Sequence, residues 1–438
     1  MKQTIAASSS RKTAGPDVLR AVQLAWLAGS VFSVSAGYGA LIPVLPGWLT
    51  SMLPGISYIE VSKHVGFLSG VYAAGVLLGA PLWGIASDRV GRGRILLIGL
   101  AGYVISQLLL LFPAIVGLVG IYVLRAATGF FVAAVVPVVA ALVAEHTPVE
   151  QRARRFAWLG AMSLLGFLFG PALIEVANGV GRLLLVDGVV NTALSAKLVL
   201  VLSALLGGMM MLGLAGTLPS SPVVEAAVQT KPASLVRAQP TALLWLSGVV
   251  MFVLAGFELG LVLQQSPRHA ALMLAECSLV MLGVNAVLFV TSLLEKRAAR
   301  TLIGIGLVLA IFGLTVLAAG RSGAWMYLGV SLTSAGIGLV LPVITYLAAG
   351  AAPNSLGAVM GGLAAASGLG QTLGSAAGGW LFGVLAQHSY GWLTLPLMVM
   401  LILLLVRSGW WTVVAVAAAP SPKSGGMTSE PSATTPAI

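Results

Sequence analysis

The chain has little charge and almost no cysteine. Of its 438 residues only 8% are charged, 12 are acidic, and Cys277 is the single cysteine. One cysteine excludes an intrachain disulfide and a cysteine-rich metal site, so we expect Cys277 to be a small packing residue. With 58% hydrophobic residues and a mean hydropathy of +1.03, the chain cannot cover a water-soluble globule with polar surface. The composition therefore predicts a protein that lies in a lipid bilayer.

The sequence also lacks the motifs of a membrane enzyme or an ATP-driven pump. It has no HExxH, no GxxxxGK[ST] and no nucleophile elbow, and its four histidines are scattered. No basic cluster with interleaved aromatic residues is present, so nucleic acid is not an expected partner. We predict no enzyme activity, no cofactor and no metal. A non-transporting membrane sensor is a less favoured alternative, because no soluble segment is longer than a loop.

Long apolar runs follow one another along the chain. A membrane-spanning helix needs about 20 mostly apolar residues, and about twelve such runs are separated by short polar segments. The expected spans are 22–45, 65–86, 95–111, 115–144, 156–176, 194–214, 242–263, 271–293, 302–319, 324–349, 356–386 and 392 to about 406. The predicted fold class is an all-α membrane protein with 12 transmembrane helices.

The longest polar interruption, residues 217–240, divides six spans from six. Gly166 and Gly170 recur as Gly370 and Gly374 at a shift of 204 positions, and two prolines recur at a shift of 205. This repeat predicts two pseudo-symmetric six-helix bundles. The expected domains are the cytoplasmic tail 1–20, the bundle 21–216, the central cytoplasmic loop 217–240, the bundle 241–418 and a disordered cytoplasmic tail 419–438.

Basic residues are distributed unevenly between the two sets of loops. Sixteen lysines and arginines fall on one side of the expected spans and five on the other. By the positive-inside rule, the richer side, which includes both termini, is cytoplasmic. We expect a multi-pass protein of the bacterial cytoplasmic (inner) membrane, with the lipid bilayer as its partner and a monomeric state.

The segment 84–94, GIASDRVGRGR, joins the second and third spans. It resembles the loop G-x-x-x-D-R-x-G-R-[RK] of the major facilitator superfamily of transporters, with the candidate gate residues Gly84, Asp88, Arg89, Gly91, Arg92 and Arg94. The resemblance implies that Asp88 faces the start of the eleventh span near Pro353 and that Arg92 bridges toward Glu145. Such contacts would latch the halves on the cytoplasmic side. A merely solvated turn explains the arginines but not the spacing of the aspartate and glycines.

Two further patterns resemble this superfamily. Arg125 and Gly129 match the fourth-helix pattern R-x-x-x-G, which implies a role in proton transfer or substrate contact. The alternative is a structural arginine that satisfies a neighbouring helix. Gly166, Gly170 and Pro171 match part of the fifth-helix pattern of the antiporters, although Ile174 and Glu175 replace its closing glycines. The small residues are also expected to form smooth contacts on which two rocking halves could slide.

Three carboxylates lie in or near spans and away from the basic loops: Glu175, Glu258 and Glu276. A carboxyl group removed from water is more stable in its neutral form, so it can carry a proton. Glu258 is our first candidate for proton coupling and Glu276 the second. For Glu175 we favour an interfacial carboxylate that pairs with Arg268 or Arg182, and this reading is also open for the other two.

Few strong polar groups remain at membrane depth. Tyr38, Gln107, Asn285 and Gln371 are the candidates for lining a substrate cavity, although each could instead bond between helices. The resemblance predicts a secondary active transporter that exports a small amphiphilic drug-like compound or metabolite in exchange for protons, by alternating access. A dedicated exporter of an endogenous metabolite such as a siderophore, and a proton-coupled importer, are the alternatives.

Overall fold

The structure is a computed structural model that describes residues 19–147, 149–184, 191–218, 241–291, 293, 297–320, 323–351 and 356–406. The helices of the N-terminal half are α1 (Ala21–Met52), α2 (Tyr58–Val90), α3 (Arg92–Leu109), α4 (Pro113–Val132), α5 (Val136–Glu145), α6 (Val149–Leu184) and α7 (Thr192–Thr217). Those of the C-terminal half are α8 (Thr241–Gln264), α9 (Pro267–Thr291), α11 (Ala299–Ala318), α12 (Ala324–Ala351), α13 (Leu356–Leu385), the 3-10 turn η2 (Ala386–His388) and α14 (Ser389–Val406).

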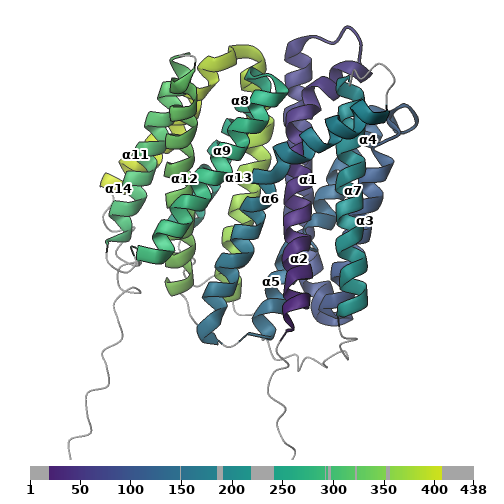
Figure 1. Ribbon diagram of the computed structural model, residues 1–438. Helices are drawn as coiled ribbons and strands as arrows, with labels where there is room; N and C mark the ends of the chain where they lie inside the picture. The colour runs from purple at the N-terminus through teal and green to yellow at the C-terminus, as the bar shows by residue number, and fades with distance from the viewer. Residues whose placement is uncertain are drawn as a thin grey trace, which may run out of the picture.

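The two halves form helical bundles that stand side by side, with α1 to α7 on the right of Figure 1 and α11 to α14 on the left. In the described part of the chain, 11 stretches are long and apolar enough to cross a membrane. The last of these, Val359–Val406, contains both α13 and α14, which η2 separates. Counted as two, these helices bring the total to the twelve spans that the hydropathy predicts.

Several helices extend beyond their apolar runs. The second span is apolar from residue 65, yet α2 begins at Tyr58 because Ser57 and Glu60 form a capping box. The Glu60 amide donates to Ser57 Oγ at 3.3 Å, and the Ser57 amide donates to Glu60 Oε2 at 3.3 Å. Local capping therefore sets this helix start, whereas hydropathy sets only the part that crosses lipid.

The fourth span is not one continuous helix. α4 ends at Val132 and α5 begins at Val136, and the two lie in one apolar stretch. Pro137 lies at the start of α5. Its nitrogen has no hydrogen to donate to the carbonyl oxygen one turn earlier, so the hydrogen-bond ladder is interrupted there. The predicted single helix over 115–144 is thus broken near its middle.

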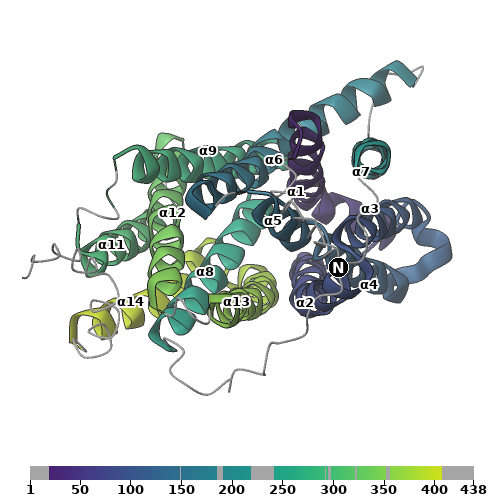
Figure 2. The ribbon, with the colours of Figure 1, turned by 90° about the horizontal axis from the view of Figure 1, so that it is seen from below.

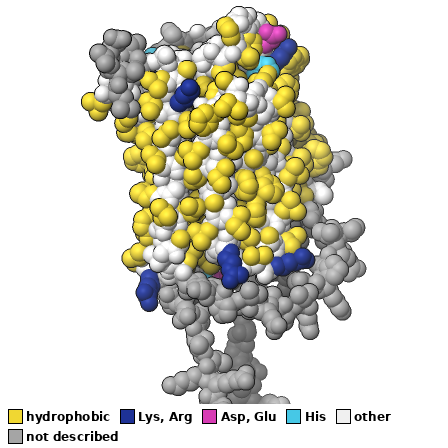
Figure 3. All heavy atoms as spheres, turned by 90° about the vertical axis from the view of Figure 1, so that its right-hand side faces the viewer, with side chains coloured by type: hydrophobic (Ala, Val, Ile, Leu, Met, Phe, Trp, Pro, Cys, Tyr) yellow, Lys and Arg dark blue, Asp and Glu magenta, His cyan; other side chains and the backbone are white. Residues whose placement is uncertain are grey.

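The surface shows an apolar band between two polar ends. Figure 3 shows hydrophobic side chains over the middle of one face and most of the visible lysine and arginine side chains at the lower end. We call this lower end the basic end; α2 ends and α3 begins there, with Arg89, Arg92 and Arg94 around the turn. Such a band matches the hydrocarbon layer of a membrane.

The halves meet along two seams. Seen from the basic end, α13 lies beside α2 and α9 lies beside α6 (Figure 2), and both pairs of helices are in contact. In the first seam, Gly66 faces Gly379 so closely that a Cβ at Gly379 would lie 2.5 Å from the Gly66 Cα. Only glycine permits this approach of the two backbones.

Other contacts between the halves lie toward the end opposite the basic end. The Tyr58 hydroxyl of α2 donates to the Leu263 carbonyl oxygen at 2.8 Å, and Gln264 Nε2 donates to the same hydroxyl at 2.9 Å. Arg268 Nε lies 3.9 Å from Glu175 Oε1. Near the basic end of α2, by contrast, a Cβ at Gly84 would meet no atom within 4 Å. The described contacts therefore close the molecule at the end opposite the basic end.

The prediction that Gly166 and Gly170 form contacts between the two halves is wrong. Gly166 packs against the Phe32 carbonyl oxygen and Gly170 against the Gly39 backbone, so both lie in the contact of α6 with α1, inside the N-terminal half. They do not lie on the surface where the halves meet. The helix rotation that buries these glycines against α1 leaves other residues of α6 to face α9. Glycines that do join the halves lie between α2 and α13, where Gly66 faces Gly379 and Gly70 lies against the Thr372 carbonyl oxygen.

Candidate functional site

Arg125 lies in the middle of the N-terminal half with 1% of its surface exposed. Its guanidinium carbon lies 4.8 Å from the centroid of the Tyr72 ring on α2. A Cβ at Gly129, one turn further along α4, would overlap the Tyr72 carbonyl oxygen. The R-x-x-x-G spacing therefore has a physical reason: the glycine lets α4 approach α2, and the arginine then reaches the aromatic face, where a cation is attracted.

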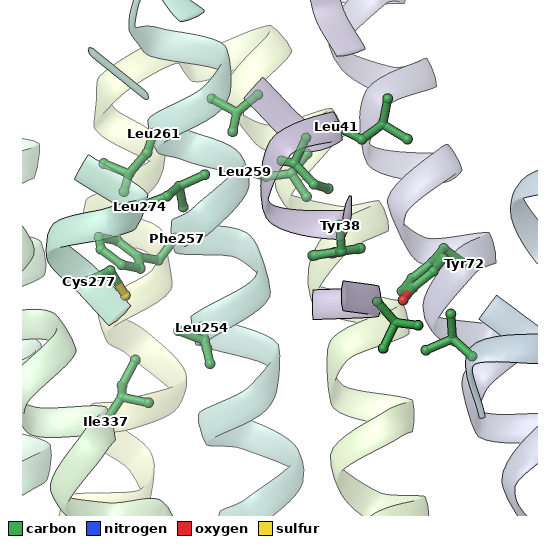
Figure 4. Packing of buried hydrophobic residues seen from close by; sticks show 14 of the residues in the cluster. Tyr38, Leu41, Tyr72, Leu254, Phe257, Leu259, Leu261, Leu274, Cys277 and Ile337 are labelled. Carbon is green, nitrogen blue, oxygen red and sulfur yellow. The ribbon is translucent and has the colours of Figure 1, made fainter. Parts of the chain in front are cut away.

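Aromatic rings connect Arg125 to the interface between the halves. Tyr38 on α1 is 9% exposed, and its ring centroid lies 4.7 Å from that of Tyr72 and 5.4 Å from that of Phe167. Figure 4 shows Tyr38 between Tyr72 and the residues of α8. Tyr38 interacts electrostatically with both Arg125 and Glu258. Tyr38 thus lies between Tyr72, whose ring contacts Arg125, and α8, the helix that carries Glu258.

Glu258 lies on α8 and is half-buried. It forms no hydrogen bond or ion pair with any other residue that the structure describes. Gly256, two residues before it, lets α8 pack closely against α13, because a Cβ at Gly378 would lie 2.9 Å from the Gly256 Cα. A carboxyl group that is partly accessible and unpaired can exchange a proton with a cavity without first breaking an ion pair.

Glu276 differs from Glu258 because it has a partner. Ser331 Oγ on α12 donates to Glu276 Oε1 at 2.5 Å, while Glu276 Oε2 is buried without a hydrogen bond. Cys277 is buried beside it, with 3% of its surface exposed, and is a packing residue as expected. The sequence carried no signal for Ser331, because only the packing of α9 against α12 brings the two side chains together.

The third carboxylate, Glu175, is 57% exposed and lies beside Arg268. This is the interfacial pairing that the sequence suggested for it. Both side chains are largely in water, so the attraction is weak. Glu175 is therefore not part of the buried polar site.

The gate segment forms a small network at the basic end. Arg92 Nη2 lies 2.9 Å from Asp88 Oδ1, Arg92 Nε lies 2.5 Å from Glu145 Oε1, and Arg92 Nη1 donates to Ser87 Oγ at 3.0 Å. Gly91 has φ of 103°, a conformation that glycine adopts readily, and it separates α2 from α3. The expected partner of Asp88 near Pro353 lies outside the described residues.

The remaining candidates are spread over both halves. Gln107 is 2% exposed; its Nε2 donates to Tyr103 Oη at 3.4 Å, and its Oε1 has no partner. Asn285 donates to the Met281 carbonyl oxygen of its own helix at 2.9 Å, which is a structural contact. Gln371 is half-buried on α13. The described residues contain no group of three or more side chains suited to hold a metal ion.

Tyr103 is a residue of this site that the sequence analysis did not select. It is 2% exposed, and its hydroxyl lies where a Cβ at Gly37 would be. It also interacts electrostatically with Arg125. Because Gly37 has no side chain, there is room for this hydroxyl. Gly37 and Tyr38 therefore both shape the environment of Arg125.

Known proteins resemble this chain in sequence and in fold. It is 28% identical over 381 residues to the class D tetracycline resistance protein of Salmonella ordonez, a match that covers 82% of this chain and 89% of that protein. It is 35% identical over 137 residues to the class B tetracycline resistance protein of Escherichia coli, which is 31% of this chain and a third (33%) of that relative. The inward-open structure of the xylose transporter XylE from E. coli matches with a TM-score of 0.67 at 17% identity, over 90% of this chain and 98% of that one.

The family model of the Major Facilitator Superfamily matches residues 27–355. This range begins within α1, extends past α12 and includes the gate segment, Arg125, Glu258 and Glu276. The family and the relatives are transporters and not enzymes, in agreement with the twelve-helix architecture. This chain is a multi-pass membrane protein that belongs to the Major Facilitator Superfamily.

Proposed function

We propose that this protein is a proton-coupled antiporter that exports a small amphiphilic compound by alternating access. The observation that carries the proposal is the arrangement of two opposite groups on two different halves. Arg125 holds a permanent positive charge inside the N-terminal half, and Glu258 presents an unpaired carboxyl group from the C-terminal half, with Tyr38 between them. Several similar proteins are tetracycline resistance proteins, and this supports export as the direction of transport.

The two groups have different physical roles. A guanidinium does not lose its proton in a protein, so Arg125 is a fixed charge. A carboxyl group in a partly dry site is neutral when protonated and costly when charged. Protonation of Glu258 therefore changes the charge of the central site by one unit, and substrate and proton can oppose each other there. Competition for one site is the simplest basis of antiport.

The relative motion of the halves supplies alternating access. The described contacts join the halves at the end opposite the basic end, and we propose that the basic end faces the cytoplasm of a bacterium, through the inner membrane. In the opposite conformation, Asp88 would face the other half near Pro353 and latch the cytoplasmic side, with Arg92 and Glu145 holding the loop in place. The Gly66 and Gly379 contact would then open.

The proposal is tested with purified protein in liposomes that contain a pH-sensitive dye. A proton gradient should drive the uptake or release of an amphiphilic substrate, and substrate flux should in turn move the internal pH. Glu258→Gln should abolish the coupled pH change. Glu175→Gln is the matched control, because that carboxylate is exposed and lies near Arg268. A Glu258→Gln protein that keeps wild-type coupled flux would refute the assignment, and a wild-type protein in which no solute moves the pH would refute antiport.

A further inference from the structure

A groove lies on the surface of the N-terminal half, between α1, α3 and α7. It has a volume of about 540 Å³, and the described residues that line it are all uncharged. Trp26 of α1 closes one end with its ring against Gly213, and Val104 and Leu108 of α3 form one wall. A Cβ at Gly208, on the floor of the groove, would meet no atom within 4 Å. The groove therefore exists because α7 carries glycine where the neighbouring helices leave space.

The groove faces lipid and has the depth of one leaflet. Leu205 and Leu212, which also line it, are 63% and 70% exposed. Its residues on α7 extend from Val201 to Gly213, a rise of about 18 Å toward the basic end, where α7 ends. The hydrocarbon layer of one leaflet is about 15 Å deep. Figure 3 looks onto this side of the molecule and shows apolar side chains over its middle and lysine and arginine side chains along its lower edge.

Arg94 lies where the groove reaches the basic end. A Cβ at Gly93 would lie 3.6 Å from Leu218 Cδ1, so α3 begins beside the end of α7. Arg94 falls on the face of α3 that carries Val104 and Leu108, because positions 94, 97, 101, 104 and 108 follow one another in steps of three and four residues. Its side chain is exposed. A positive charge thus stands at the end of the apolar wall.

A second arginine lies at the start of α1. The Arg20 amide donates to Gln23 Oε1 at 2.8 Å, and Gln23 Nε2 donates to the Thr217 carbonyl oxygen at 2.8 Å. The exposed Arg20 is therefore held beside the last residue of α7, as Arg94 is from the side of α3. In the described part of the chain, neither arginine forms an ion pair.

Shape and charge favour the same occupant. Apolar side chains gain little from one another in a bilayer, because lipid tails are as apolar as they are, so an acyl chain can fill the groove. The head group of that lipid then decides the affinity, and basic side chains near the membrane surface attract anionic head groups. Asp88 and Glu145, two acidic residues of this end, both pair with Arg92 and leave the charges of Arg20 and Arg94 available.

We propose that the groove binds one anionic phospholipid of the leaflet at the basic end, with an acyl chain along α7 and its phosphate at Arg20 and Arg94. Each arginine should contribute about fivefold in affinity, so the site should prefer an anionic over a zwitterionic head group about 25-fold. The site lies on the lipid-facing surface of the N-terminal half. It therefore depends on neither the direction of transport nor the coupling to protons.

The test uses quenching of Trp26 fluorescence by brominated acyl chains, which quench only the tryptophans that they contact. The full-length protein is placed in phosphatidylcholine vesicles that contain a rising fraction of dibrominated phosphatidylglycerol or, in parallel, dibrominated phosphatidylcholine. The difference between the wild type and Trp26→Phe isolates the signal of this tryptophan. The binding constant for phosphatidylglycerol relative to phosphatidylcholine should be about 25. Equal quenching by the two lipids would show ordinary lipid contact and overturn the proposal.

Charge variants locate the head group. Arg20→Gln and Arg94→Gln should each lower the preference for phosphatidylglycerol about fivefold. Arg297→Gln is the matched control, because Arg297 is an exposed arginine between α9 and α11 in the other half and the change in net charge is the same. It should keep the preference of the wild type. An equal loss in all three variants would reduce the effect to overall charge and overturn the site.

A glycine variant locates the acyl chain. Gly208→Leu places a side chain in the groove where no protein atom lies within 4 Å, so it should lower the quenching of Trp26 by both brominated lipids. Gly283→Leu on α9 is the control, since a Cβ there also meets no atom within 4 Å, and it should leave the quenching unchanged. Unfolding temperatures show that both variants are folded. Unchanged quenching in Gly208→Leu would place the chain outside the groove.

A different occupant gives a different result. A second copy of the chain on this face would shield Trp26 from both lipids and would appear as a dimer in native mass spectrometry. That outcome would overturn the proposal. None of these measurements uses a substrate or a proton gradient, so their failure leaves the proposed antiport unchanged, and the failure of antiport leaves the lipid site unchanged.

Discussion

Gly379→Ala should shift the balance between the two conformations of the carrier. A Cβ at residue 379 would lie 2.5 Å from the Gly66 Cα and 2.6 Å from the Ser62 carbonyl oxygen, and both are backbone atoms that cannot rotate away. Ordinary contact begins near 3.4 Å, so α2 and α13 must separate by about 0.9 Å at this point. Overpacking of this kind costs about 1 to 3 kcal/mol.

This cost applies only to the conformation in which the two glycines touch. The population closed at the end opposite the basic end should therefore fall by about 5-fold to 150-fold relative to the other conformation. Spin labels at Ser51→Cys and His388→Cys, both exposed and on different halves, report the separation at that end in a Cys277→Ala background. The distance distribution measured by double electron-electron resonance should shift toward longer values in Gly379→Ala.

Two controls on neighbouring glycines decide whether the reasoning holds. Gly361→Ala lies on the same helix where a Cβ meets no atom within 4 Å, so the distance distribution should not change. Gly370→Ala would overlap the Gly248 carbonyl oxygen within the C-terminal half, so it should lower the unfolding temperature without a shift in distance. If Gly379→Ala behaves like Gly370→Ala, with a loss of stability and no shift in distance, the two glycines do not lie on a surface that opens.

Two further predictions concern carboxylates outside the Arg125 pocket. Asp88→Asn should slow turnover with little change in apparent affinity, because the residue belongs to the proposed latch and not to the cavity. The Asp88 side chain is 59% exposed, so the free energy of unfolding should change by less than about 1 kcal/mol. Initial rates over a range of substrate concentrations measure turnover and apparent affinity, and an equal loss of affinity would contradict the latch. Glu276→Gln should keep the pH profile of transport, since Ser331 can still donate to the amide oxygen; a flattened profile would move proton coupling from Glu258 to Glu276.

The sequence was informative wherever one helix or one loop decides the outcome. The apolar runs predicted the spans, and the pattern around Asp88 indicated that Arg92 would reach Glu145, which it does. The apolar run alone placed the start of the second span at residue 65, whereas the Ser57 and Glu60 capping box begins the helix earlier. In each case the interacting residues are neighbours in sequence or belong to a pattern that this family shares.

Residues that act across helices were harder to place. The sequence selected Gly166 and Gly170 but not the helix that they face, which is α1 and not a helix of the other half. It selected Arg125 but not the two free donors on one edge of its guanidinium group, and it did not select Tyr103 or Ser331. These facts depend on how each helix is rotated about its axis, which the spacing of residues within one helix leaves open.

By itself, the sequence predicted that this protein lies in a bilayer, that it has two similar halves and that its basic residues gather on one side of the membrane. These properties follow from how much apolar length and how much charge each segment carries, and no tertiary contact is needed to read them. Only the tertiary structure decided that Tyr38 lies between Tyr72, the ring against Arg125, and α8, the helix of Glu258, and that no described carboxylate of the N-terminal half pairs with that arginine. The reason is physical: Tyr38, Arg125 and Glu258 lie on α1, α4 and α8, and their separation is set by helix packing and not by the chain between them.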